Sequence, residues 1–208
     1  VAMKLLILLI CSFNIAGAKV TKFEKESEVN MGNQTKFTIS AGWSCDQDTK
    51  KLTSPEGDLT AYLLEKPFKG DPEAFALELW KSVQPDFKFR VLQKVSPPAV
   101  DGWEQTHQIV YETPSKDNKT VITAIRVFKG RAFALLLDAA NAGLAQRAAQ
   151  LQIVSNTWKP TDLKKEDLSQ AQVKQFSNAE AQEMDKFIAK AMKELSLPGA
   201  SVAIIQND

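Results

Sequence analysis

Two neighbouring segments, residues 120–128 and 132–137, constrain the fold most, because each is largely apolar on both of its faces. The residues from Thr120 to Phe128 alternate as a strand does, and Lys129-Gly130 joins them tightly to Ala132–Leu137. Glycine at this junction permits the positive φ that a hairpin turn requires. A strand that is apolar on both faces lies inside a sheet that is covered on both sides. The sequence therefore predicts two central antiparallel strands joined by a hairpin.

The cover on one side is predicted to be a helix that follows these strands. Its apolar residues repeat at helical spacing and are Leu144, Ala148, Leu151, Val154 and Trp158, before Pro160. A second helix is predicted to begin at Asp71-Pro72, where a cap residue precedes proline at the first helical position. Its apolar face is Phe75, Ala76, Leu79, Trp80 and Val83, and Pro85 ends it.

Three further strands are predicted at residues 35–40, 59–65 and 103–112, each bounded by turn-forming residues. The order strand, strand, helix, three strands, helix indicates an α+β fold, in which helices pack on an antiparallel sheet. We expect this domain to span residues 19–159. The four tryptophans, Trp43, Trp80, Trp103 and Trp158, lie at element ends or on apolar faces, and we expect them in the core.

Three segments of this domain resemble the PsbP/Mog1-like fold. They are the F-T-I-S-A-G-W run at 37–43, the D-P-E-A-F-A-L-E-L-W helix at 71–80, and the closing helix that ends in Trp158. The resemblance concerns the fold only, so it implies small exported or binding proteins as a class and no particular ligand.

The first residues have the pattern of an export signal. Met3-Lys4 gives a positive start, residues 5–13 are apolar, and Ala16-Gly17-Ala18 offers small residues for cleavage between Ala18 and Lys19. The apolar run is shorter than the roughly 20 residues of a membrane span, and Ile10 before Cys11 disfavours a lipoprotein. We therefore expect an exported bacterial protein, periplasmic or secreted, with signal peptide 1–18 removed and no membrane span left.

Charge and cysteine content narrow the functional classes further. The chain has 26 basic and 25 acidic residues, a formal net charge of +1, without the clustered basic face that nucleic acid requires. No nucleic-acid partner is expected. Cleavage would leave Cys45 as a single cysteine, so disulfides do not stabilise the domain. Asp46 and Asp48 would raise the pKa of its thiol if they lie close, and we expect an unreactive cysteine.

Residues 160–176 are polar and predict a linker, after which residues 177–208 predict the start of a second unit. Ser177 and Glu180 form a capping box for a helix, Leu197-Pro198-Gly199 ends it, and Ser201–Asp208 begins an apolar strand. This order resembles the opening of the serine β-lactamase and penicillin-binding superfamily. The resemblance implies a serine hydrolase acting on cell-wall or small ester or amide substrates, with its catalytic residues beyond this sequence.

The motifs of that superfamily are absent from the chain itself. No serine is followed three residues later by lysine, Tyr62 and Tyr111 are not followed by x-Asn, and Lys119-Thr120 precedes Val121 instead of glycine. The Gly199-Ala200-Ser201 sequence follows a helix, where a hydrolase elbow follows a strand. We therefore predict no catalytic residue in this chain.

Metal and cofactor sites are not expected either. His107 is the single histidine, and with Cys45 it gives too few ligands for a usual zinc site. We expect His107 at the surface or hydrogen-bonded locally. Asp46, Asp48 and Asp58 lack the glycine and distal glutamate of a calcium loop. Two hypotheses remain: the N-terminal part of a β-lactamase-related hydrolase, and a non-enzymatic binding or interaction module. In the second, the apolar stripe Met184, Phe187, Ile188 and Met192 would pack on the first domain.

Overall fold

The computed structural model describes residues 20–31, 35–164 and 175–204. The predicted signal segment, its cleavage site at Ala18 and Lys19, and most of the predicted linker lie outside the described residues. The predictions for those segments stay predictions.

Within the described residues, eight strands form one antiparallel sheet, which confirms the predicted α+β class. In spatial order they are β1 (Val20–Lys22), β4 (Ser44–Asp46), β5 (Lys51–Thr53), β6 (Leu59–Pro67), β10 (Arg131–Ala140), β9 (Lys119–Phe128), β8 (Gln105–Tyr111) and β7 (Val91–Val95). Strand β10 pairs along its length with β6 and β9, so the predicted central strands are confirmed. The turn between β9 and β10 has positive φ at both Lys129 and Gly130, as a tight hairpin requires.

A second, smaller sheet joins segments that are far apart in the sequence. Its order is β11 (Lys159–Pro160), β3 (Thr35–Ile39) and β2 (Ser27–Asn30). The strand predicted at 35–40 is therefore present, but it belongs to this separate sheet. Pro160 in β11 and the buried Leu163 pack with the rest, so the packed unit continues to Leu163, just past residue 159.

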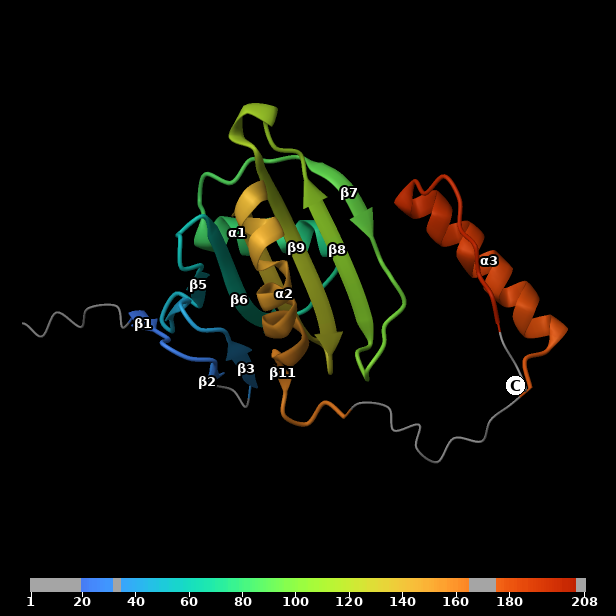
Figure 1. The fold of residues 1–208 in the computed structure, drawn as a ribbon, viewed down its shortest axis with the longest axis horizontal. Helices are drawn as coiled ribbons and strands as arrows, with labels where there is room; N and C mark the ends of the chain where they lie inside the picture. The colour runs from blue at the N-terminus through green and yellow to red at the C-terminus, as the bar shows by residue number, and fades with distance from the viewer. Residues whose placement is uncertain (1–19, 32–34, 165–174, 205–208) are drawn as a thin grey trace, which may run out of the picture.

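One helix covers each face of the large sheet (Figure 1). Helix α1 (Pro72–Val83) begins at Asp71, whose carboxylate accepts from the amides of Glu73 and Ala74, so the predicted cap is confirmed. Helix α2 (Asn141–Thr157) lies on the opposite face together with the small sheet. A short 3₁₀ helix, η1 (Ser115–Asp117), lies between β8 and β9.

These layers enclose a hydrophobic core on each side of the sheet. The core under α2 includes Phe37, Trp43, Leu52, Phe133, Leu151, Val154 and Trp158. The core under α1 includes Phe75, Leu79, Trp80, Ile109, Val121, Ile125 and Leu136. All four tryptophans are at most 9% exposed, which confirms the expectation that they belong to the core.

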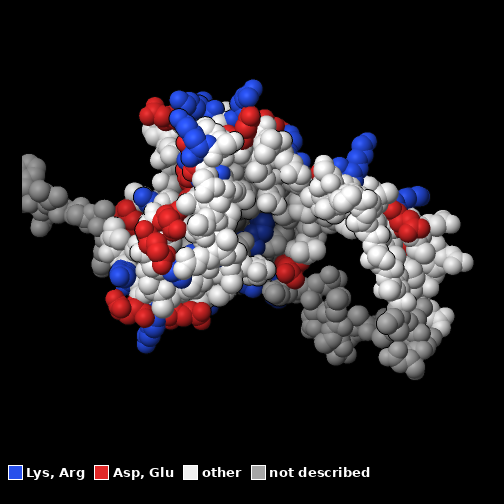
Figure 2. Space-filling model, turned by 45° about the horizontal axis from the view of Figure 1, so that its top comes forward, with Lys and Arg blue, Asp and Glu red and all other residues white. Residues whose placement is uncertain are grey.

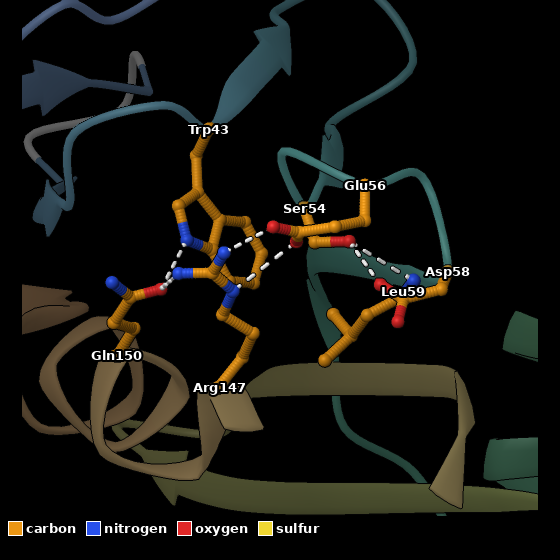
Figure 3. A network of polar contacts seen from close by, with 7 residues as sticks. All are labelled: Trp43, Ser54, Glu56, Asp58, Leu59, Arg147 and Gln150. Atoms are coloured by element: carbon orange, nitrogen blue, oxygen red, sulfur yellow. Dashed lines mark hydrogen bonds and ion pairs between the residues drawn. The ribbon is translucent and has the colours of Figure 1, made fainter. Parts of the chain in front are cut away.

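The inward face of α2 differs from the predicted one at Ala148, which is exposed. Leu151 and Val154 are buried as predicted, and Gly143, which was not predicted, is buried as well, because the N-terminal half of the helix packs on the turn between β5 and β6. There the guanidinium of Arg147 bonds to the carboxylate of Glu56 (Figure 3). A long side chain can place its stem on the core while its charged head reaches the surface.

Helix α3 (Asn178–Leu195) has the predicted capping box, in which Ser177 and Glu180 bond reciprocally. It lies beside β7, outside the two-core body (Figure 1), and contains no buried residue. The predicted strand at Ser201–Asp208 is not formed over the described residues 201–204. Backbone groups in a strand need a pairing partner, and residues 201–204 pair with no described strand.

Candidate functional site

An apolar groove separates the edge of the large sheet from α3. Its volume is about 330 Å³. One wall is formed by Val95, the last residue of β7, and by Ser96, Pro97 and Pro98, which follow it. The other wall is formed by Phe187, Lys190, Ala191, Glu194 and Leu195 of α3. The Nε2 group of Gln93 in β7 donates to the carbonyl of Glu194 at 3.2 Å, so a polar contact bridges the two walls.

Exposed large apolar side chains gather around this groove and on the segment that follows it. Phe187 is 53% exposed and Leu92, in β7, is 67% exposed. Others are Leu195, Leu197, Val202 and Ile204. Apolar surface concentrated in one part of a protein commonly marks a contact with another molecule. The predicted packing of the α3 stripe onto the first domain is thus only partial.

Strand β7 is the last strand of the large sheet, and its one partner among the described strands is β8. Edge strands present backbone N–H and C=O groups that an added strand can bond. A β-bulge between Val91 and Gln93 interrupts its register with β8, and bulges are common at such edges. The groove therefore lies where the last residue of this edge strand, Val95, meets apolar side chains of α3.

A serine and a histidine meet beside the groove, and an amide rather than a carboxylate lies next to the histidine. The Ser96 hydroxyl lies 2.9 Å from Nδ1 of His107, and Nε2 of His107 lies 3.1 Å from the amide oxygen of Gln105. A neutral amide does not stabilise the imidazolium that forms when histidine takes a proton, as a carboxylate does. Pro97 and Pro98 have no N–H to donate to an oxyanion. The expectation that His107 is hydrogen-bonded locally is confirmed.

A second, polar pocket lies at the C-terminal end of α2. Its volume is about 140 Å³, and its walls are Asp101, Trp103, Arg126, Asn156, Lys159 and Leu163. Strand β9 carries Arg126 on the face that α2 covers, where Nη2 donates to the carbonyls of Ser155 and, at 3.1 Å, of Trp158. The guanidinium carbon lies 4.6 Å from the ring centre of Trp103, within reach of a cation–π interaction.

Burial lowers the pKa of the Arg126 guanidinium to about 10. The group is still charged at neutral pH. Among the described residues no carboxylate forms an ion pair with Arg126, and carbonyl dipoles and an aromatic ring are its partners instead. Cations near the C-terminus of a helix are stabilised by its dipole, so Arg126 also caps α2.

The remaining residues considered from the sequence are structural. Cys45 is a fully buried free thiol, and burial, with a smaller contribution from Asp46, raises its pKa to about 11. The carboxylate of Asp46 accepts from the amides of Asp48 and Thr49, a local turn as expected. The described residues contain no group of three or more potential metal ligands.

The surface carries no large patch of one charge in the view of Figure 2, where acidic and basic side chains are interspersed. Over the described chain, no helix has both the length and the apolar character needed to span a bilayer.

Sequence reasoning missed both pockets. For the polar one, a signal exists in the sequence: Arg126 shares the alternating face of β9 with Ile122, Ala124 and Phe128. A single charge on an otherwise apolar face indicates either a helix cap or a ligand contact. The groove had no comparable signal, because β7 is short and lacks a clear alternation.

Comparison with known proteins gives no family for this chain. No protein-family model matches it, and no curated protein matches it. Among solved structures, the solution structure of the PsbP protein of the cyanobacterium Synechocystis sp. PCC 6803 (CyanoP) aligns with a TM-score of 0.45 and 10% identity. The alignment covers 71% of this chain and 95% of that chain. Nothing in these comparisons supports the predicted relation to serine β-lactamases.

Proposed function

We propose that this protein is a non-enzymatic interaction module that binds an extended, apolar segment of a partner protein in the groove between β7 and α3. The observation that carries the proposal is the apolar groove of about 330 Å³ beside an open sheet edge. A partner strand placed there would bond to the backbone of β7 and bury its side chains against Phe187 and Leu195. Both kinds of contact favour an extended peptide over a helix or a small polar ligand.

The same surroundings argue against an enzyme. Ser96 and His107 lie at hydrogen-bond distance, yet Gln105 occupies the place of the orienting acid and two prolines follow the serine. The alternative, that residues 177–208 open a β-lactamase-like hydrolase domain, stays a prediction. Export of the protein likewise stays part of the proposal, because the signal segment lies outside the described residues.

The test uses a phage-displayed library of short linear peptides selected against the full chain, with the Kd of selected peptides measured by fluorescence anisotropy. Replacing Phe187 with Asp removes one apolar wall and adds a charge. Burial of a phenylalanine side chain contributes about 1.5–3 kcal/mol, so F187D should weaken binding by about tenfold or more. Leu77→Asp is the matched control, because Leu77 is an exposed leucine, 38% accessible, on α1 rather than at the groove.

A second experiment tests whether the bound peptide pairs with β7 as a strand. In a strand, the N–H groups of alternate residues point to opposite sides. N-methylation of one alternate set of residues in a selected peptide removes the N–H groups that would bond to β7, whereas N-methylation of the other set leaves those N–H groups in place. We expect one set to abolish binding and the other to be tolerated. Peptides that bind F187D and L77D equally well, or that tolerate methylation at every position, would refute the proposal.

A further inference from the structure

The pocket at the C-terminal end of α2 offers hydrogen-bond donors for which the described residues supply no acceptor. Both hydrogen bonds that Arg126 makes to described residues come from Nη2. One face of the guanidinium lies against Trp103. The Nε–H group and the Nη1–H groups have no acceptor among the described residues, and each can donate to an oxygen of a carboxylate or phosphate.

Two further side chains in the pocket have suitable chemistry. Lys159 adds a second positive charge, and the amide of Asn156 adds a further donor. Neither the ammonium of Lys159 nor the guanidinium of Arg126 is paired with a carboxylate in the described parts of the chain. Asp101 also lines the pocket, and its negative charge opposes an anion there.

The size of the pocket limits the ligand. A volume of about 140 Å³ holds about five water molecules at their liquid volume. This is enough for a carboxylate or phosphate group. Trp103 and Leu163 supply apolar walls beside the charged groups, which suits an anionic group attached to a short carbon chain.

We infer that this pocket is an oxyanion site, in which Arg126 and Lys159 bind the terminal carboxylate or phosphate group of a ligand. The site lies apart from the apolar groove in its residues and in its chemistry. It therefore adds a second ligand to the interaction module and does not depend on the groove being occupied.

The test is an NMR titration of the full chain with inorganic phosphate and, separately, with acetate, at constant ionic strength with chloride as the balancing anion. The reporter is the indole N–H resonance of Trp103, assigned by its loss in Trp103→Phe. Saturable shifts with phosphate alone would indicate a phosphate ligand, shifts with acetate alone a carboxylate, and shifts with both the shared oxyanion chemistry.

Variants distinguish the site from a general effect of charge. Lys159→Gln should weaken binding by about tenfold, the effect of one charge-assisted hydrogen bond. Lys164→Gln is the matched control, since Lys164 is a nearby exposed lysine that does not line the pocket. Asp101→Asn should tighten binding several-fold. All three leave the cap of α2 by Arg126 intact.

Two results would overturn the inference. One is the absence of any saturable shift of the Trp103 resonance with either anion. The other is an equal loss of affinity in K159Q and K164Q together with no gain in D101N, which would indicate non-specific screening of surface charge.

Discussion

Replacing Gly143 with alanine should destabilise the protein, although alanine is the better helix former. Gly143 lies in the first turn of α2 and is buried against Asp58. A β-carbon added at this position would lie 2.2 Å from Oδ2, 2.5 Å from Cγ and 2.8 Å from Oδ1 of Asp58. These separations are too short for any pair of non-bonded atoms, so the whole carboxyl group of Asp58 must move.

Movement of Asp58 breaks a buried hydrogen-bond network. Oδ1 of Asp58 accepts from the hydroxyl of Ser54 at 2.8 Å, and that hydroxyl accepts from the amide of Leu59 at 3.1 Å (Figure 3). Ser54 is 4% exposed, so water does not readily replace the lost acceptor.

The magnitude follows from three contributions. Leaving the buried hydroxyl of Ser54 without its acceptor costs about 1–3 kcal/mol, and inserting a methyl group into a packed site costs about 1–3 kcal/mol. Alanine returns about 1 kcal/mol through its helix propensity. The free energy of unfolding should fall by about 1–5 kcal/mol, which lowers Tm by roughly 2–20 °C for a domain of this size.

A double-mutant cycle tests this reasoning by chemical denaturation of the wild type, G143A, D58A and G143A/D58A. In the D58A background no carboxylate opposes the new methyl group, so G143A should be neutral or stabilising there. The coupling between the two positions should therefore be at least as large as the loss that G143A causes alone. Equal destabilisation by G143A in both backgrounds, or stabilisation by G143A alone, would refute the argument.

Three other perturbations have defined outcomes. Cys45, whose pKa burial raises to about 11, should react with iodoacetamide at pH 8 far more slowly in the native than in the guanidinium-unfolded protein; equal rates would show that the thiol is accessible. Thr123→Val removes the acceptor of Trp80 Nε1, which lies 2.7 Å from the hydroxyl, and should lower the unfolding free energy by about 1–3 kcal/mol. Thr123→Ser keeps the hydroxyl and should lower it less; a larger loss in Thr123→Ser than in Thr123→Val, measured by urea denaturation, would contradict this. Burial is the largest effect on the pKa of His107 and lowers it; Lys94 also lowers this pKa, and Asp71 opposes them. Near and below pH 6.5 the unfolded chain therefore binds more protons than the native one, and the free energy of unfolding should fall as the pH falls. His107→Gln should reduce the slope of unfolding free energy against pH between pH 7 and 5, and an unchanged slope would exclude His107 as its source.

The parts of the fold with a strong local pattern could be predicted from the sequence. Alternation predicted β9, a continuous apolar run after Lys129-Gly130 predicted β10, and the caps at Asp71 and Ser177 placed the starts of α1 and α3. Periodicity also predicts which residues of these elements face the core, because side chains return to the same face every two residues in a strand and about every 3.6 residues in a helix.

The short strands could not be predicted, because their order depends on distant partners. Strands β1, β4 and β5 have three residues each, too few for a period to show. Strand β11 forms only because Lys159 and Pro160 meet Lys36 and Thr35, which are far away in the sequence. Tertiary context of this kind overrides local propensity.

The candidate sites depend on the same long-range placement. The sequence shows that Arg126 is a charge on an apolar strand, but only the crossing of α2 over β9 brings the carbonyls of Ser155 and Trp158 to its guanidinium. The groove likewise forms where α3 approaches the end of β7. Conversely, the apolar run at Ser201–Ile204 favoured a strand, yet no described strand lies beside it to pair with.

Amide hydrogen exchange of the full chain, with and without a saturating selected peptide, tests the proposed interaction most directly. If an extended partner segment adds to the sheet edge, amides of β7, residues 91–95, should exchange more slowly in the complex, and F187D should abolish the protection while L77D retains it. Protection confined to another edge, such as β1 (Val20–Lys22), or no protection of β7 at saturation, would contradict the assignment of the groove as the partner-binding site.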